Sequence, residues 1–162
     1  MSTIDDIPLR EHLLLAVRKF VEAASALDGV ERISLLGSLA TEKQDPKDAD
    51  VMVMIRKGVN LQLLASIGRK LKGAAQTRNA GADIFLCTTD GEYLGRTCSY
   101  RQCHIRVACR GMQCGRGTFL CDDLEEITLK KGIILEPPVD LWPEVVKRSK
   151  QPEDVESLLC VE

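Results

Sequence analysis

The stretch LLGSLATEKQDPKDADVMVMI, residues 35–55, sets the expected fold of this chain. Its start continues a short apolar run over 32–36, which ends at Gly37-Ser38 and predicts a buried strand that enters a tight turn. After a polar loop, residues 49–55 contain valine and isoleucine, which are enriched in strands, and so predict a second strand. The stretch therefore predicts a strand, a turn, a loop and a further strand.

Two acids stand two residues apart where the second of these strands begins, at Asp48 and Asp50. Strand side chains alternate between faces, so both carboxylates are expected on one side. Adjacent carboxylates repel unless a cation lies between them. Magnesium suits such oxygen ligands, because it binds carboxylates together with substrate phosphates. The residues expected on the opposite, core-facing side are Ala49, Val51, Val53 and Ile55.

The Gly37-Ser38 turn is the second candidate feature. Glycine allows a ligand to approach the backbone closely, and a helix that starts here would present free N–H groups to a phosphate. The serine hydroxyl would add one more donor. The turn and the acids are thus complementary, because one suits a phosphate and the other suits the metal that neutralises it.

Working outward, apolar residues at steps of three and four predict helices over 9–27 and from about Asn60 to Gly73. Residues 82–87 predict a third strand, and a short helix is expected after Ser38. The order of elements predicts an α/β (α+β) fold, a small mixed sheet with helices packed on it.

Beyond residue 90 the periodic pattern ends. We expect one domain over 1–148 whose core is 9–90. The later expectations are an irregular Cys/Arg-rich segment over 91–121, a strand or hairpin over 127–136 that turns at Lys131-Gly132, a short helix within 139–146, and a polar tail over 149–162.

A third acid, Asp83, lies near the start of the third predicted strand. A lone aspartate there is usually a cap or a loop neighbour. Beside two other strand carboxylates, it becomes a candidate metal ligand or base.

The pattern of hydrophobic-Gly-Ser, nine residues, Asp-hydrophobic-Asp-hydrophobic and a later strand Asp resembles the polymerase-beta-like nucleotidyltransferase superfamily, and in size its minimal members. The resemblance covers about residues 9–87. It implies transfer of a nucleoside monophosphate from an NTP such as ATP to an acceptor hydroxyl. It also implies two magnesium ions. The implied roles are triphosphate binding for Gly37 and Ser38, metal binding for Asp48 and Asp50, and metal binding or base catalysis for Asp83.

Many members of that superfamily have an arginine after Gly-Ser, where this chain has Leu39 and Ala40. Contact with the terminal phosphates would then come from Lys43, Lys47 or a later arginine. The rival hypothesis is a catalytically silent binding or regulatory protein of the same fold, either an antitoxin-like subunit with a protein partner or a zinc-containing interaction module. The acceptor stays open among small molecules, RNA and protein.

Five of the seven cysteines lie between positions 98 and 121. Two C-x4-C pairs suit structural zinc, which favours four Cys or His ligands. The alternative is that some of these cysteines are small core residues. The proposed zinc ligands are Cys98, Cys103, Cys109 and Cys114, with His104 or Cys121 as substitutes.

The same segment is locally basic in a chain whose net charge is −2. Guanidinium groups match phosphate geometry, so the segment could hold a triphosphate or RNA. The alternative is a solvated loop balanced by the acids that follow at 122–126. The arginines are Arg96, Arg101, Arg106, Arg110 and Arg116.

The composition is that of an ordinary globular domain, with 44% hydrophobic and 28% charged residues. No run approaches the roughly 18 apolar residues of a membrane span. The first residues lack a basic region and an apolar core, so we expect no signal peptide, no membrane partner and a cytoplasmic location.

Overall fold

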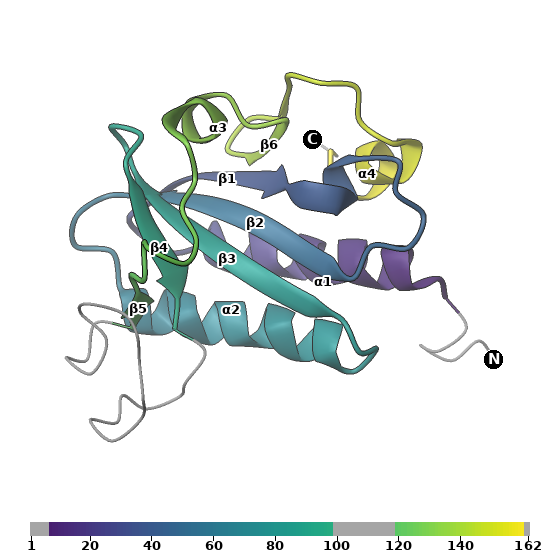
Figure 1. The fold of residues 1–162 in the computed structure, drawn as a ribbon, viewed down its shortest axis with the longest axis horizontal. Helices are drawn as coiled ribbons and strands as arrows, with labels where there is room; N and C mark the ends of the chain where they lie inside the picture. Colours follow the sequence, from purple (N-terminus) through teal and green to yellow (C-terminus); the bar gives the residue numbers. More distant parts are fainter. Residues whose placement is uncertain (1–6, 99–118, 161–162) are drawn as a thin grey trace.

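The computed structural model describes residues 7–98 and 119–160, and its centre is one seven-stranded sheet (Figure 1). The strands lie in the order β5-β4-β3-β2-β1-β6-β7. β2 and β3 are parallel, whereas every other neighbouring pair in this sheet is antiparallel. The mixed sheet confirms the expected fold class. The strands are β1 (Val30–Leu36), β2 (Asp48–Ile55), β3 (Gly81–Thr88), β4 (Tyr93–Thr97), β5 (Leu120–Cys121), β6 (Val139–Trp142) and β7 (Val146–Lys147).

Two long helices, α1 (Leu9–Ala24) and α2 (Leu61–Gln76), lie side by side across one face of the sheet (Figure 1). Both were predicted from their apolar stripes. The side chain of Asn60 accepts a hydrogen bond from the Leu63 N–H, as expected of an N-cap. Within the described part of the chain, no helix could span a bilayer.

The sheet is buried on both faces, but unequally. The face toward α1 and α2 carries the larger core, in which Ala49, Val51 and Val53 are completely buried. A smaller cluster on the other face lies against the short helix α3 (Lys131–Leu135), whose Ile134 is buried with Met52. Asp48 is exposed and Asp50 half-buried at the start of β2, so this end of the face is more open than the middle of the strand at Met52.

Three local expectations for the second half of the chain are wrong. The expected strand or hairpin over 127–136 contains α3, and the expected helix within 139–146 is the antiparallel pair β6–β7. Strands β4 and β5 occupy the described ends of the segment expected to be irregular. Such short segments have weak intrinsic preferences, and their tertiary partners decide their structure.

The expected polar tail also has structure. Residues Glu153–Leu158 form α4, which packs on α1 and buries Val155 completely. β6 pairs with β1 on its free edge, so the chain beyond Pro138 completes both the sheet and the core.

Candidate active site

The parallel register of β2 and β3 brings the predicted acids together. Asp50 and Asp83 are directly paired across these strands. Neighbouring strands lie about 4.8 Å apart, and paired residues point to the same face. Asp48 is two residues before Asp50 and pairs with Gly81, so it belongs to the same face. The three acids therefore lie on one face of the sheet, at its more open end.

Burial and the neighbouring acids change the pKa of Asp50. Its pKa is raised from the ordinary value of 3.8 to about 6, first by burial and then by the charges of Asp83 and Asp48. A cation placed among these carboxylates would favour the ionised form of Asp50. The negative charge of these neighbouring carboxylates is thus suited to a divalent ion.

Two glycines make room for the carboxylates. Leu36 pairs with Asp50, and Gly37 follows it with a φ of +69°. A β-carbon at Gly37 would overlap Oδ2 of Asp50, and one at Gly81 would lie 2.6 Å from Oδ1 of Asp48. Sequence reasoning singled out Gly37 for phosphate approach but missed Gly81, although it directly precedes the predicted strand. At both positions a side chain would displace a candidate metal ligand.

The predicted short helix after Ser38 is a single 3-10 segment, η2 (Gly37–Ala40). Gly37 is exposed and Ser38 half-buried, whereas Leu39 is completely buried. The carbonyl of Ser38 accepts hydrogen bonds from the backbone N–H and the hydroxyl of Thr41, at 3.1 and 2.7 Å. Gly37 and Ser38 therefore face outward from a turn that is anchored by Leu39.

Lys43 and Lys47 are exposed on the loop between η2 and β2. Their carbonyl groups have defined partners, because Lys47 accepts from the Gly81 N–H at 2.8 Å and Lys43 accepts from Arg10 at 2.9 Å. Both lysines are thus fixed at the backbone beside the candidate site.

An arginine lies next to the third acid. Arg96 of β4 pairs with Phe85 in the sheet, and its guanidinium reaches Oδ1 of Asp83 at 3.3 Å. Sequence reasoning placed Arg96 in the basic segment but did not connect it to Asp83, because that contact depends on the β3–β4 register. The remaining arginines of that segment, Arg101, Arg106, Arg110 and Arg116, lie outside the described residues.

The zinc prediction falls mostly outside the described residues as well. Cys98 is buried and Cys121 half-buried. The other proposed ligands lie within 99–118, so convergence of the set stays a prediction. They are Cys103, His104, Cys109 and Cys114.

Across residues 7–98 and 119–160, no three His, Cys, Asp or Glu side chains form a group that could hold a metal ion. Magnesium does not need such a group, because it commonly takes one or two carboxylates and fills its other positions with substrate phosphates and water. The chemistry of Asp48, Asp50 and Asp83 therefore fits a magnesium ion that arrives with its nucleotide.

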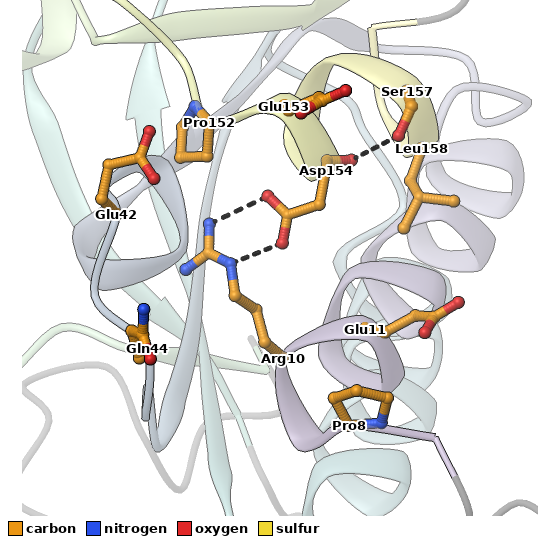
Figure 2. A pocket seen from close by; sticks show the side chains of 10 residues that line it. All are labelled: Pro8, Arg10, Glu11, Glu42, Gln44, Pro152, Glu153, Asp154, Ser157 and Leu158. Carbon is orange, nitrogen blue, oxygen red and sulfur yellow. Dashed lines mark hydrogen bonds and ion pairs between the residues drawn. The ribbon is translucent and has the colours of Figure 1, made fainter.

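A separate feature was missed by sequence reasoning. A cavity of about 670 Å³ opens between the start of α1, the loop after η2 and α4 (Figure 2). Its lining includes none of the three aspartates and is rich in acidic side chains. In it, Arg10 and Asp154 form an ion pair that no local sequence pattern indicates.

Comparison with known proteins adds one finding. The chain belongs to a family of unknown function, DUF6932, whose model matches residues 3–134. No curated protein and no solved structure matches the chain. The family match contains the Gly37-Ser38 turn and all three aspartates and ends before β6. Because its description names no activity, the function has to be argued from the site.

Proposed function

We propose that this member of the DUF6932 family is a magnesium-dependent nucleotidyltransferase. It would move a nucleoside monophosphate from an NTP to an acceptor hydroxyl and release pyrophosphate. The observation that carries the proposal is the pairing of Asp50 with Asp83 on parallel strands, with Gly37 directly against Asp50. This arrangement matches what the resemblance to the polymerase-beta-like superfamily implies for the same residues.

The carboxylates of Asp48, Asp50 and Asp83 would hold the magnesium ions. When bound, magnesium neutralises phosphate oxygens and favours loss of a proton from the attacking hydroxyl. Asp50 gains most from this, because burial and two neighbouring charges disfavour its ionised form. The exposed backbone at Gly37 leaves space for the triphosphate next to Asp50.

The remaining steps belong to the chain itself. Asp83 accepts the proton of the acceptor hydroxyl, and Arg96, whose guanidinium bonds that carboxylate, places a positive charge near the phosphates. The acceptor oxygen forms a bond to the α-phosphorus. The bond from the α-phosphorus to the oxygen that bridges to the β-phosphate breaks, and pyrophosphate leaves with that oxygen. The acceptor is a small molecule, an RNA or a protein side chain.

One observation favours a catalytically silent binding protein as the second candidate. The residue after Ser38 is Leu39, which is completely buried, so it offers no charge to the terminal phosphates. A silent protein would use the same turn to hold a nucleotide, or the same fold to hold a protein partner.

Transfer of label separates the two candidates. The protein is incubated with magnesium and each NTP, labelled at either the α- or the γ-phosphorus, with and without cell extract. A nucleotidyltransferase passes the α-label to an acceptor and leaves the γ-label in pyrophosphate. Asp50→Asn should abolish the transfer, whereas Asp90→Asn, in the exposed turn after β3, should not. Binding of NTP without any transfer of the α-label would favour the silent protein.

A further inference from the structure

Arg10 stands in the first turn of α1, yet its side chain is only 12% exposed. Figure 2 shows the guanidinium extended from the helix toward Asp154 of α4. Its Nε lies 2.6 Å from Oδ2 of Asp154 and one terminal nitrogen lies 3.3 Å from Oδ1. Two nitrogens thus engage the two oxygens of one carboxylate, which fixes the plane of the guanidinium.

The same guanidinium donates to the backbone of the candidate phosphate turn and of the loop after it. It reaches the carbonyl of Leu39 at 2.9 Å and that of Lys43 at 2.9 Å. A third, longer bond reaches the carbonyl of Ser38 at 3.5 Å. The Arg10 side chain therefore binds both ends of residues 39–43, which lead from η2 into the loop before β2.

Apart from the Thr41 bonds to the Ser38 carbonyl and the buried Leu39 side chain, this segment depends on contacts from outside it. η2 has four residues and no side-chain cap, and short 3-10 helices have poor hydrogen-bond geometry. The carbonyls that close such a helix need partners outside it. Arg10 supplies such a partner for the Leu39 carbonyl and a second, longer bond to that of Ser38, and so ties the end of η2 to α1.

Asp154 and the helix that carries it, α4, are each held by a further contact. Its Oδ1 accepts the N–H of Val155 at 2.8 Å, and Val155 is completely buried beside α1. Lys147 of β7 bonds Glu156 at 3.1 Å and ties α4 to the sheet edge. The position of α4 is thus transmitted through Asp154 and Arg10 to the turn.

We infer that Arg10 is a positioning residue for the Gly37-Ser38 turn, and that the C-terminal helix α4 acts on the same turn through Asp154. This inference rests on the proposed function, because it assigns the turn to the triphosphate. The chain lacks an arginine after Gly-Ser, and here an arginine from α1 supports the turn from behind through its carbonyls.

The test compares Arg10→Lys and Asp154→Asn with the wild type. Lysine keeps the positive charge but presents a single nitrogen, which cannot reach the separate carbonyls and the carboxylate together. Arg18→Lys is the matched control, because Arg18 lies on the same helix but is exposed and pairs with Glu22, at 3.7 Å, across one helical turn.

Two readouts are needed. Hydrogen exchange of residues 38–43 should become faster in Arg10→Lys, while exchange in β1 and β2 stays unchanged. Titration with magnesium-ATP should show a Kd raised about tenfold, the effect of lost hydrogen bonds to a charged group. Asp154→Asn should give a smaller change in the same direction. Partial unfolding would instead lower the fraction of protein that binds and leave the Kd unchanged.

The outcomes are separable. If the wild type binds magnesium-ATP and Arg10→Lys has the same Kd and the same exchange at 38–43, the inference fails while the proposed function stands. A lowered binding fraction with an unchanged Kd would also overturn it. If the wild type binds no magnesium-ATP, both fail, and accelerated exchange at 38–43 would show that Arg10 only stabilises the loop.

Discussion

Gly37 and the Asp50 carboxylate lie so close together that a β-carbon at position 37 would overlap Oδ2 of Asp50. The contact follows from the β1–β2 register, in which Leu36 pairs with Asp50. The glycine therefore has two roles at once. It permits the positive φ of the turn, and it leaves the space that the carboxylate occupies.

Gly37→Ala should consequently damage the site more than the fold. The left-handed backbone conformation should cost about 1 kcal/mol of unfolding free energy with any other residue. The new methyl group would in addition displace Asp50, so binding of magnesium-ATP should be lost. Urea unfolding and titration measure the two effects.

Gly58→Ala is the matched control for this prediction. Gly58 also has a positive φ, of +89°, but its added β-carbon would meet no atom within 4 Å. It should lose a similar amount of stability and keep its affinity for magnesium-ATP. Equal affinity of both variants for magnesium-ATP would contradict the prediction that Gly37 leaves the space needed by Asp50.

The first half of the fold could be predicted because its signals are local. α1 and α2 repeat apolar residues at helical spacing, and β2 combines Val51 and Val53 with two acids on the alternate face. The second half could not be predicted in this way. β5 and β7 have two residues each and exist as strands only through pairing with β4 and β6.

The residues of the candidate site likewise include some that a local pattern indicates and some that it does not. Asp48, Asp50 and Asp83 could be chosen from spacing, because alternation along a strand places side chains without knowledge of the partner. Arg96 reaches Asp83 through the β3–β4 register, and Arg10 reaches the turn across 29 positions to Leu39. Such contacts depend on how distant elements pack, which no local pattern contains.

Val155→Ala tests whether the C-terminal residues belong to the core. Val155 is completely buried in α4, and loss of two methyl groups from a packed site should cost about 2–3 kcal/mol of unfolding free energy. Val146→Ala is the control, because Val146 is 36% exposed and should change stability by about 0.5 kcal/mol or less. Urea unfolding that gives equal values would mean that α4 adds nothing to the fold.

Arg96→Ala should change the affinities for the free metal ion and for the nucleotide in opposite directions. Arg96 competes with a cation for Asp83, to which it bonds at 3.3 Å, so its removal should tighten binding of the free ion. The gain should be about two- to fivefold, as for a partly exposed ion pair. Affinity for magnesium-ATP should fall, because the site loses a positive charge near the phosphates.

Manganese is a practical probe of the free ion, since it takes the same oxygen ligands and is detected by its paramagnetism. Arg56→Ala serves as the control, because Arg56 pairs with Asp28 and Glu31 beyond the other end of β2. Weaker manganese binding in Arg96→Ala would indicate that Arg96 supports the metal ligands and does not compete for them.

Asp50→Asn should make the ligand-free protein more stable, and the gain should depend on pH. The pKa of Asp50 is raised to about 6 in the folded protein, above its ordinary value of 3.8. Between these values the folded state binds more protons than the unfolded state, so wild-type stability falls as pH rises through this window. Below it the acid is neutral in both states and asparagine gives no pH-linked gain. Above about pH 6 the full gain of about 1–2 kcal/mol should be present, after allowance for the partial exposure of Asp50.

Magnesium completes this prediction, because it should reverse the difference between the two proteins. Near neutral pH, millimolar magnesium should raise the unfolding free energy of the wild type by stabilising ionised Asp50, and should leave Asp50→Asn nearly unchanged. Asp90→Asn, an exposed position on the turn after β3, should respond to magnesium as the wild type does. Urea unfolding at about pH 4 and about pH 7.5, with and without the ion, measures all of these differences. If Asp50→Asn and the wild type had the same difference in unfolding free energy at both pH values, Asp50 would not be a carboxylate whose ionisation is disfavoured by its neighbours. If magnesium raised the unfolding free energy of both proteins equally, the ion would not bind at the Asp50 carboxylate.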